Sequence, residues 1–298
     1  MYKRQGLGLS LGGVLNIALD PFFVLPFGLN MNIKGAAIAT LISNVVTTLY
    51  FAILLIVIRK KSVVSFSPKK ACLAIKEKIA RNVLFTGLPS ALQTMLSAVS
   101  NLVLNSLMIG YGETAEAAIG VTKKIDAVPF GMVTGLAQGA APLIAYNNGA
   151  KKYDKMKTTL KLSLCYCVGL AITVLIVVES AAGALIEVFI KDASTVTYGE
   201  KFLRLHCASL PFMAVTFMLV SYFQAVSAKG KAFLLSIIRK GIVDIPLMYL
   251  LNVLIPVYGI VACQPITDVI SATVGVILYV LWKKKFQKTE EEQEIIVQ

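Results

Sequence analysis

Apolar residues occur along this chain in eight long runs, which are separated by shorter polar connections. Each run holds about 20 residues or more, and a helix of that length can cross a hydrocarbon core of roughly 30 Å. A backbone inside a membrane must bond its own polar groups, which favours helices. The pattern therefore predicts an all-α polytopic membrane protein with eight transmembrane helices. These helices are expected over residues 6–26, 35–58, 83–109, 117–146, 158–180, 200–226, 232–254 and 258–282.

The composition supports a membrane protein and explains the basic balance of the chain. Of the 298 residues, 57% are hydrophobic and 15% are charged, against roughly 25% charged in an average soluble domain. The net charge of +13 comes mainly from alternate connections, at 59–81, 151–161, 229–240 and 283–288. Cytoplasmic loops retain Lys and Arg, so both termini are expected in the cytoplasm. The charge thus indicates a lipid bilayer and not nucleic acid as the partner, and the basic loops could also contact anionic lipid head groups.

The first two and the last two apolar runs resemble each other when they are aligned without gaps at an offset of 224 residues. The aligned pairs are Asp20 with Asp244, Gly35 with Gly259, Asn44 with Asp268, and the basic triplet 59–61 with 283–285. Internal repeats of this kind are common in secondary transporters, whose transport sites lie between two similar lobes. A six-helix second repeat would leave the first repeat with only its last two helices here. We therefore expect two lobes and interpret the sequence as an N-terminally truncated fragment.

This interpretation divides the chain into four parts. Residues 1–58 are expected to form the last two helices of the N-terminal lobe, and residues 59–82 a cytoplasmic linker between the lobes. Residues 83–282 are expected to form a six-helix C-terminal lobe, and residues 283–298 a cytoplasmic tail. The second half of the linker could lie on the inner membrane surface as an amphipathic helix.

One acidic residue, Asp20, lies inside the first apolar run, in the stretch LNIALDPFFVLP. An aspartate at the centre of a membrane helix costs about 2.5–3.5 kcal/mol to insert, so it persists mainly where it is paired or functional. Asn16 precedes it by one helical turn, and the two side chains share a face. Their oxygens could bind Na⁺, or the carboxyl group could carry a proton. A purely structural role, a cap or a hydrogen bond to a neighbouring helix, is the third interpretation.

The second repeat differs at this site, because Lys240 stands where the first repeat has Asn16. Lys240 and Asp244 are four residues apart and are expected to pair along their own helix. An acid with an internal cation has little reason to bind another one. The acid of the first repeat has a neutral neighbour, so we place the transport chemistry at Asp20.

Several segments of the chain are distinctive. They are NIALDPFF with NMNIKGAAIATLIS near the start, GLPSALQ at 87–93, and GVTKKIDAVPFGMVTGLAQGAAPLIAYNNGAKKYDKM at 120–156. These segments resemble the MATE (multidrug and toxic compound extrusion) family of transporters, most closely its bacterial multidrug-export type, and the resemblance extends over nearly the whole chain. It implies twelve helices in two lobes around a central cleft, and export of drugs or organic cations in exchange for H⁺ or Na⁺. It also implies that four N-terminal helices are absent from this sequence.

The same resemblance implies a cation site in the N-terminal lobe. In the family, an Asn and an Asp on the fifth helix join a Thr on the sixth helix and an Asp on the first. Asn16 and Asp20 match the first two, Thr40 in AAIATLIS matches the third, and the first-helix Asp has no counterpart here. Some members use an acid on the seventh helix, where this sequence has Ser97. That difference argues against a cation site in the C-terminal lobe.

Two further groups of residues are candidates for substrate contact or for helix bending and packing. The possible substrate cleft comprises Met95, Lys123, Asp126 and Gln138, and the bending and packing group comprises Pro21, Pro129, Gly131, Gly135 and Gly139. Lys123 and Asp126 could instead pair with each other across three residues, and Met95 could be plain packing. Glycines four residues apart permit close helix approach. Pro21 and Pro26 are expected to break the first helix beside Asp20.

The function predicted from these features is secondary active efflux of drugs or organic cations across a bacterial cell membrane, in antiport with H⁺ or Na⁺. A flippase for lipid-linked saccharides of the same superfamily is the alternative. It would need several basic residues inside the cleft, whereas most cations here are expected in loops. The only histidine, His206, has no acid within one turn, and the sequence has no phosphate loop or zinc-ligand spacing. Enzyme chemistry is therefore not expected, and we expect a monomer that needs no cofactor.

Overall fold

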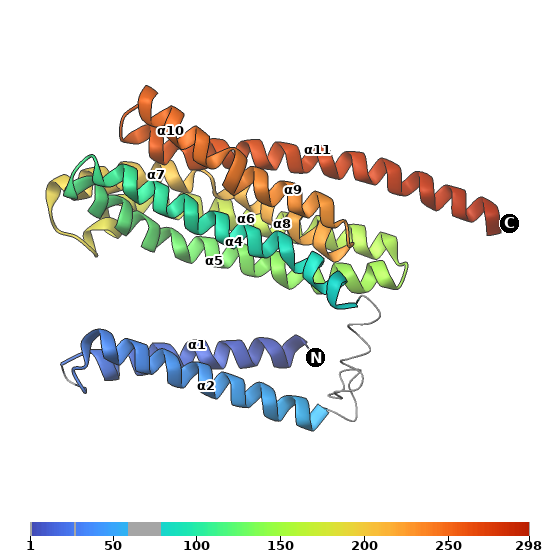
Figure 1. Ribbon diagram of the computed structural model, residues 1–298, viewed down its shortest axis with the longest axis horizontal. Helices are drawn as coiled ribbons and strands as arrows, with labels where there is room; N and C mark the ends of the chain where they lie inside the picture. The colour runs from blue at the N-terminus through green and yellow to red at the C-terminus, as the bar shows by residue number, and fades with distance from the viewer. Residues whose placement is uncertain (1, 27, 59–78, 298) are drawn as a thin grey trace. The chain divides into compact units, whose positions relative to one another are not determined.

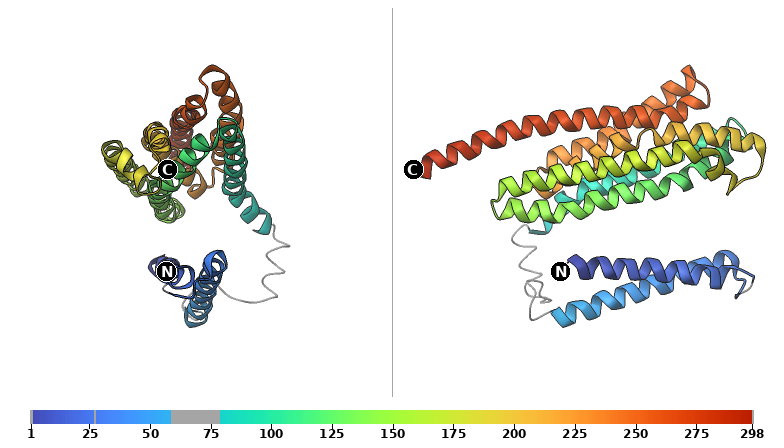
Figure 2. Two further views of the ribbon diagram at one scale, coloured as in Figure 1. Left: turned by 90° about the vertical axis from the view of Figure 1, so that its left-hand side faces the viewer. Right: turned by 180° about the vertical axis from the view of Figure 1, so that it is seen from behind.

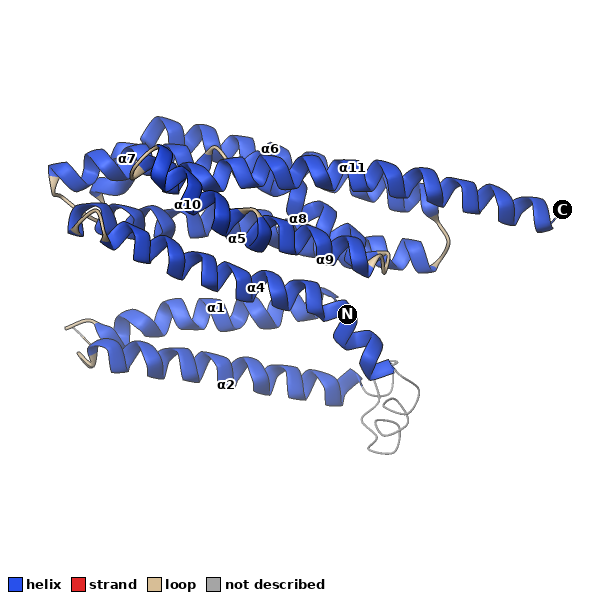
Figure 3. Ribbon diagram, turned by 45° about the horizontal axis from the view of Figure 1, so that its top comes forward, coloured by secondary structure: helices blue, strands red, loops and turns tan. Residues whose placement is uncertain are grey.

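The computed structural model describes residues 2–26, 28–58 and 79–297, and every regular element in these ranges is a helix (Figure 3). The chain divides into an N-terminal unit, Met1–Ile79, and a C-terminal unit, Ala80–Gln298. The expected linker over 59–82 lies mostly outside the described residues. The side chains of the expected tail lie outside them from residue 285 onward.

The N-terminal unit is an antiparallel pair of helices, α1 (Tyr2–Val24) and α2 (Asn32–Ile58), which lie side by side (Figures 1 and 2). A short connection joins them, in which the backbone N–H of Met31 donates to the Phe23 carbonyl at 2.9 Å. This bond satisfies a carbonyl that the end of α1 would otherwise leave unpaired. Large apolar side chains such as Leu49 are exposed on the pair, as expected for helices that face lipid.

The C-terminal unit is a bundle of helices that pack side by side (Figures 1 and 2). In chain order these are α4 (Ile79–Ile109), α5 (Glu113–Gly149), α6 (Tyr153–Glu187), α7 (Ala193–Cys207), α8 (Leu210–Ala225), α9 (Lys229–Ile237), the π-helical segment η1 (Ile238–Ile242), α10 (Asp244–Leu254) and α11 (Tyr258–Val297). Helix α5 packs against α6, α7 and α8, and α11 packs against α7, α8 and α10.

Six of the described helices are long and apolar enough to cross a membrane: α1, α2, α4, α5, α6 and α11. Helices α7 and α8 make a seventh span if the 42° bend between them is a break within one span. The eight spans expected from the apolar pattern are therefore not all found. The expected span over 232–254 is divided among α9, η1 and α10, none of which is long enough alone.

Local backbone chemistry explains both interruptions. Pro211 lies in the first turn of α8 and has no N–H to donate to the Cys207 carbonyl, which favours a bend there. In η1 the N–H of Val243 donates to the carbonyl of Ile238, five residues earlier, at 3.2 Å. The π-turn inserts one residue into the helical repeat, and such segments recur at functional sites.

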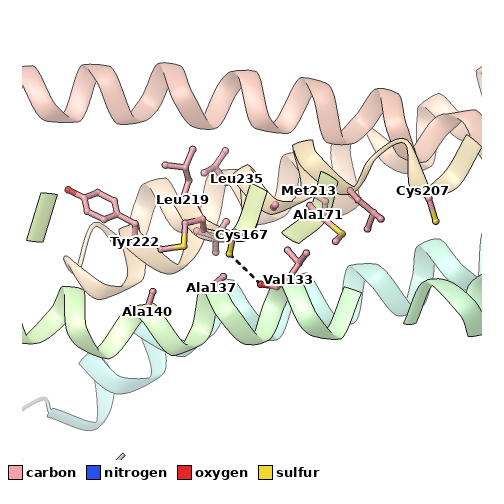
Figure 4. Close-up of a cluster of buried hydrophobic side chains, with 14 of the residues drawn as sticks. Val133, Ala137, Ala140, Cys167, Ala171, Cys207, Met213, Leu219, Tyr222 and Leu235 are labelled. Carbon is pink, nitrogen blue, oxygen red and sulfur yellow. Dashed lines mark hydrogen bonds between the residues drawn. The ribbon is translucent and has the colours of Figure 1, made fainter. Parts of the chain in front are cut away.

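The main core of the C-terminal unit lies where α5, α6, α7, α8 and α9 meet (Figure 4). Small side chains let the helices approach one another, as at Ala137 on α5 and Cys167 on α6, both at most 1% exposed. The Cys167 thiol lies 3.9 Å from the Val133 carbonyl. A second cluster joins α4, α5, α7, α10 and α11, with Met108 and Phe202 fully buried. These two clusters fix the helices that carry the polar groups of the unit.

Gly259, at the start of α11, allows a tight turn after α10, because a Cβ at this position would overlap the carbonyl oxygen of Leu251. Gly35, its aligned counterpart in the first repeat, lies similarly at the start of α2. A Cβ there would lie 2.5 Å from the carbonyl oxygen of Phe23. At both aligned positions, therefore, a helix follows an antiparallel neighbour so closely that only glycine fits without a shift of the backbone.

Gly259→Ala is expected to destabilise the full-length protein by about 1–3 kcal/mol, because overpacking against the Leu251 backbone must push α10 and α11 apart. Gly131→Ala is the matched control, since a Cβ at Gly131 meets no heavy atom within 4 Å in the described structure. Thermal unfolding in detergent measures both variants. Equal losses of stability would contradict the role assigned to Gly259.

The start of α7 carries a charged cap. Asp192 accepts hydrogen bonds through Oδ2 from Ser194 Oγ at 2.5 Å, from Thr195 Oγ1 at 2.7 Å and from the Thr195 N–H at 2.9 Å. The bond from Ser194, followed by those from Thr195, lowers the pKa of Asp192 from its ordinary 3.8 to about 2. Hydrogen bonds to a carboxylate favour its charged form.

Asp192→Asn is expected to lower the thermal stability near neutral pH, with a difference from wild type that shrinks on acidification. The folded-state pKa of Asp192 lies below its unfolded value, so its stabilising contribution is present above about pH 4 and is lost as the pH falls towards about 2. Asparagine can still cap a helix, so the substitution isolates the charge. Thermal unfolding of both proteins across this pH range is the measurement. A difference that does not change with pH would rule out this cap as its source.

Candidate functional site

The polar site of the N-terminal unit lies between α1 and α2. The Asn16 amide donates from Nδ2 to Thr40 Oγ1 at 3.4 Å, so the structure brings together these two residues from different helices. Asp20 follows Asn16 by one turn of α1 and is half-buried. Its Oδ1 is shielded from solvent and has no hydrogen-bond partner among the described residues. None of the ion pairs in the described part of the chain includes Asp20.

These three side chains can supply oxygen ligands from the carboxylate, the amide carbonyl and the hydroxyl. Hard oxygen ligands of this kind suit an alkali cation. A carboxylate oxygen that is withdrawn from water and unpaired can equally accept a proton. The unpartnered Oδ1 atom is the structural observation that fits either cation.

Pro21 lies inside α1 and does not end it. The helix continues to Val24, and the N–H of Leu25 still donates to the Pro21 carbonyl at 3.0 Å. The expected break is therefore wrong for Pro21, because this residue removes one donor without disrupting the bonds that follow it. The chain leaves the helix only just before Pro26.

The aligned acid of the second repeat, Asp244, is 1% exposed and fully engaged. Its Oδ2 accepts from Ser100 Oγ of α4 at 2.5 Å and from Lys240 Nζ at 3.3 Å. The expected pair between Lys240 and Asp244 is thus confirmed. The Lys240 ammonium also donates to Gln264 Oε1 of α11 at 2.6 Å.

The contact between Asn16 and Thr40 has a counterpart in the contact between Lys240 and Gln264, since both pairs are related by the same offset of 224 residues. The two repeats therefore place corresponding residues against each other across corresponding helices. They differ in charge: the first repeat has a neutral amide beside its acid, and the second has an ammonium group. Only the first repeat leaves its acid without an internal cation among the described residues.

A second buried ion pair lies one residue from Lys240. Arg239 Nε donates to Asp268 Oδ1 at 2.6 Å, and the Gln264 amide donates to Asp268 Oδ2 at 2.9 Å. The Arg239 guanidinium also lies 4.6 Å from the centre of the Phe217 ring. The spacing of residues along the chain did not predict this pair. The presence of an arginine and an aspartate inside apolar runs was the available signal, because such charges persist mainly as partners.

Lys123 and Asp126 on α5 do not form the ion pair that their spacing permitted. The Lys123 ammonium donates to Asn101 Oδ1 of α4 at 2.5 Å, and Asp126 Oδ2 lies 3.2 Å from His206 Nε2 of α7. The alternative that Lys123 and Asp126 pair with each other is therefore wrong, because each side chain has a partner on a neighbouring helix instead. His206 was set aside because it has no acid within one turn, but its acid comes from another helix.

These groups line a cavity of about 210 Å³ in the C-terminal unit. Of the four residues proposed for a substrate cleft, Lys123 and Asp126 line it, whereas Met95 and Gln138 do not. Both of the latter are exposed in the described structure. The remaining lining residues are Ser97, Ser100, Asn101, Leu104, Phe130, His206, Ser209, Met213, Arg239, Lys240 and Gln264.

The bending and packing candidates all lie within helix α5, apart from Pro21. Pro129 is buried inside the helix, which continues past it. A Cβ at Gly131, Gly135 or Gly139 would meet no heavy atom within 4 Å among the described residues. Close packing at these glycines is therefore not seen within the C-terminal unit, and their role in bending or in packing stays a prediction.

Comparison with known proteins identifies the family. The MatE family model matches residues 89–250, more than half of the chain. The multidrug export protein MepA of Staphylococcus saprophyticus is 30% identical over 286 residues, which cover 96% of this chain and 62% of that protein. MepA of Staphylococcus haemolyticus is 28% identical over 291 residues, which cover 98% of this chain and 62% of that protein.

Solved structures show the same fold. The outward-facing conformation of a multidrug resistance MATE family transporter superposes with a TM-score of 0.82 at 24% identity, covering 95% of this chain and 62% of that one. The Vibrio cholerae MATE transporter VcmN in its bent form gives 0.77 at 20% identity, covering 93% and 61%. The chain thus spans about 62% of the length of the curated relatives it matches. On the strength of the family match, this chain belongs to the MATE family.

Proposed function

We propose that this chain is the part of a secondary active multidrug exporter that contains its coupling site, formed by Asn16, Asp20 and Thr40. The observation that carries the proposal is the buried, unpartnered Oδ1 of Asp20 beside a neutral Asn16. The relatives named as multidrug export proteins support export as the activity. The substrates are proposed to be drugs or organic cations, and the setting a bacterial cell membrane with both termini in the cytoplasm.

The coupling follows from charge. An ionised Asp20 inside a membrane is costly, and a bound H⁺ or Na⁺ neutralises it. If the neutralised site favours one orientation of the transporter and the ionised site favours the other, cation binding shifts the equilibrium between them. Drug release in one state and drug binding in the other then produce antiport. The described residues fit H⁺ and Na⁺ equally, so both stay open.

The cavity beside Lys123 and Asp126 is proposed to be part of the substrate path. It combines polar groups with apolar walls such as Phe130 and Met213, a mixture typical of small-molecule sites. Met95 and Gln138 stay proposals for the same path at positions away from this cavity. We propose that the transporter acts as a monomer without a cofactor.

Transport of ethidium in everted membrane vesicles tests the proposed function. Full-length protein is expected to accumulate ethidium inside the vesicles under an imposed proton or sodium gradient, and not without a gradient. Transport that depends on one gradient identifies the coupling ion. Absence of ethidium transport under both gradients would contradict the proposal.

The flippase alternative is not favoured by the charges of the cavity. The expectation that most cations lie in loops is wrong for Arg239 and Lys240, which line the cavity together with Lys123. However, Arg239 is paired with Asp268 and Lys240 with Asp244. A pyrophosphate needs several uncompensated cations, and these two are already neutralised.

A further inference from the structure

The cavity of the C-terminal unit contains one cation whose charge is not matched by an acid. Lys123 Nζ donates to the neutral Asn101, and no carboxylate lies within 4 Å of it among the described residues. We propose that Lys123 forms a carboxylate-binding subsite, which selects amphipathic organic solutes that carry an acid group. This inference rests on the proposed export function and adds a class of substrate to it.

The acids around the cavity are already engaged, so they do not neutralise Lys123 directly. Asp126 contacts His206, Asp244 contacts Lys240, and Asp268 contacts Arg239. The Asp244 and Asp268 side chains are at most 1% exposed and do not line the cavity. Asp126 is the one acid among the lining residues, and its contact is His206. An incoming carboxylate would therefore contact Lys123 without an acid already bound to it, in a place where a charge-assisted hydrogen bond is stronger than in water.

His206 lies on the same cavity wall but does not compete with Lys123 for an acid. His206 is 8% exposed, and its Nδ1 has no hydrogen-bond partner among the described residues. Asp126 fixes the orientation of the ring through Nε2 at 3.2 Å. Because Nδ1 is shielded and Nε2 faces Asp126, the half-buried Lys123 is the group on this wall that meets an incoming carboxylate. Lys123 and His206 come from α5 and α7, which hold the two groups on the wall of one cavity.

The volume and lining of the cavity decide which part of a solute it can hold. About 210 Å³ is smaller than the roughly 300–1,000 Å³ of sites that enclose whole drug-sized ligands. The cavity therefore suits an acid group with its attached ring, while the rest of the solute lies outside. Ser97, Asn101 and Ser209 offer hydrogen bonds to the acid, and Leu104, Phe130 and Met213 offer apolar contact to the ring.

The test compares rhodamine B, which has a free carboxylate, with its ethyl ester, which has the same aromatic cation without the acid. Binding of each dye is measured by fluorescence on full-length protein in nanodiscs of phosphatidylcholine. Wild type is expected to prefer the acid. Lys123→Gln is expected to weaken binding of the acid about ten-fold, the size of one charge-assisted hydrogen bond, and to leave the ester unchanged.

Matched variants separate charge from structure. Lys124→Gln removes the neighbouring lysine, which is exposed and does not line the cavity, and is expected to bind both dyes as wild type does. Lys123→Arg keeps the charge and is expected to restore most of the preference for the acid. If Lys123→Gln weakens the binding of both dyes equally, or of neither dye, the proposed subsite is ruled out.

Two further arms separate this inference from its alternatives. In nanodiscs with phosphatidylglycerol the preference for rhodamine B is expected to persist, and its loss would assign the subsite to lipid phosphate instead. Gradient-driven export of the ester tests the proposed function alone. If the ester is exported but the acid is not preferred in binding, the proposed subsite is ruled out and the proposed export function stands. If neither dye is exported, the proposed export function is ruled out.

Discussion

Asp20→Asn is expected to abolish gradient-driven export of ethidium, to the level of vesicles that contain no transporter, while the protein still inserts in the membrane. Asparagine has the shape of aspartate but cannot bind a proton and carries no charge to attract Na⁺. The energetic cost of an acid in the bilayer is removed by the substitution, so insertion should not suffer. Export is measured in everted vesicles at matched protein levels.

Two further variants show whether the effect belongs to this acid. Asp154→Asn changes an exposed acid in the first turn of α6 and is expected to leave export intact. Asn16→Lys installs at the first repeat the cation that Lys240 provides in the second. It is expected to abolish export even though Asp20 is present, because an internal ammonium would occupy the place of the transported cation. Normal export by Asn16→Lys would contradict the comparison of the two repeats.

Arg239→Met is expected to lower the stability of the protein by about 3–5 kcal/mol, the typical cost of leaving one member of a buried ion pair uncompensated. Arg239 is 1% exposed and Asp268 is fully buried. Removing the guanidinium also removes its contact with the Phe217 ring. Thermal unfolding in detergent is the measurement.

An exposed arginine provides the control. Arg204 pairs with Glu200 at 2.7 Å, but both side chains are more than a third exposed. Arg204→Met is expected to change stability by no more than about 1 kcal/mol, because solvent screens such pairs. The double variant Arg239→Met with Asp268→Leu should recover much of the loss, since it leaves no unpaired charge. A double variant as unstable as Arg239→Met alone would show that lost packing, and not the buried charge, is responsible.

The sequence predicted those features that depend on neighbours along the chain. Apolar runs indicated most of the long helices, and the four-residue spacing of Lys240 and Asp244 gave their ion pair because both side chains lie on one helical face. The ungapped repeat predicted that Gly35 and Gly259 occupy related positions. The structure places each of them where a helix approaches the preceding one too closely for a Cβ.

The sequence could not predict contacts between helices that are distant along the chain. Spacing allowed Lys123 to pair with Asp126, but Asn101 and His206 on other helices bind them instead. The interruption of the expected span over 232–254 depends on the π-turn at Val243, for which an apolar pattern gives no signal. Pro21 shows the opposite case, in which a helix tolerates a residue that usually ends it.

If the coupling cation binds at Asp20, as we propose, the affinity of the protein for ethidium must depend on pH or on sodium concentration through this residue. In purified full-length wild type, the Kd for ethidium is expected to rise as the concentration of the coupling cation rises, because cation and drug favour different states. In Asp20→Asn the Kd is expected to be the same at every pH and sodium concentration. If the variant shows the same cation dependence as wild type, the coupling site lies elsewhere.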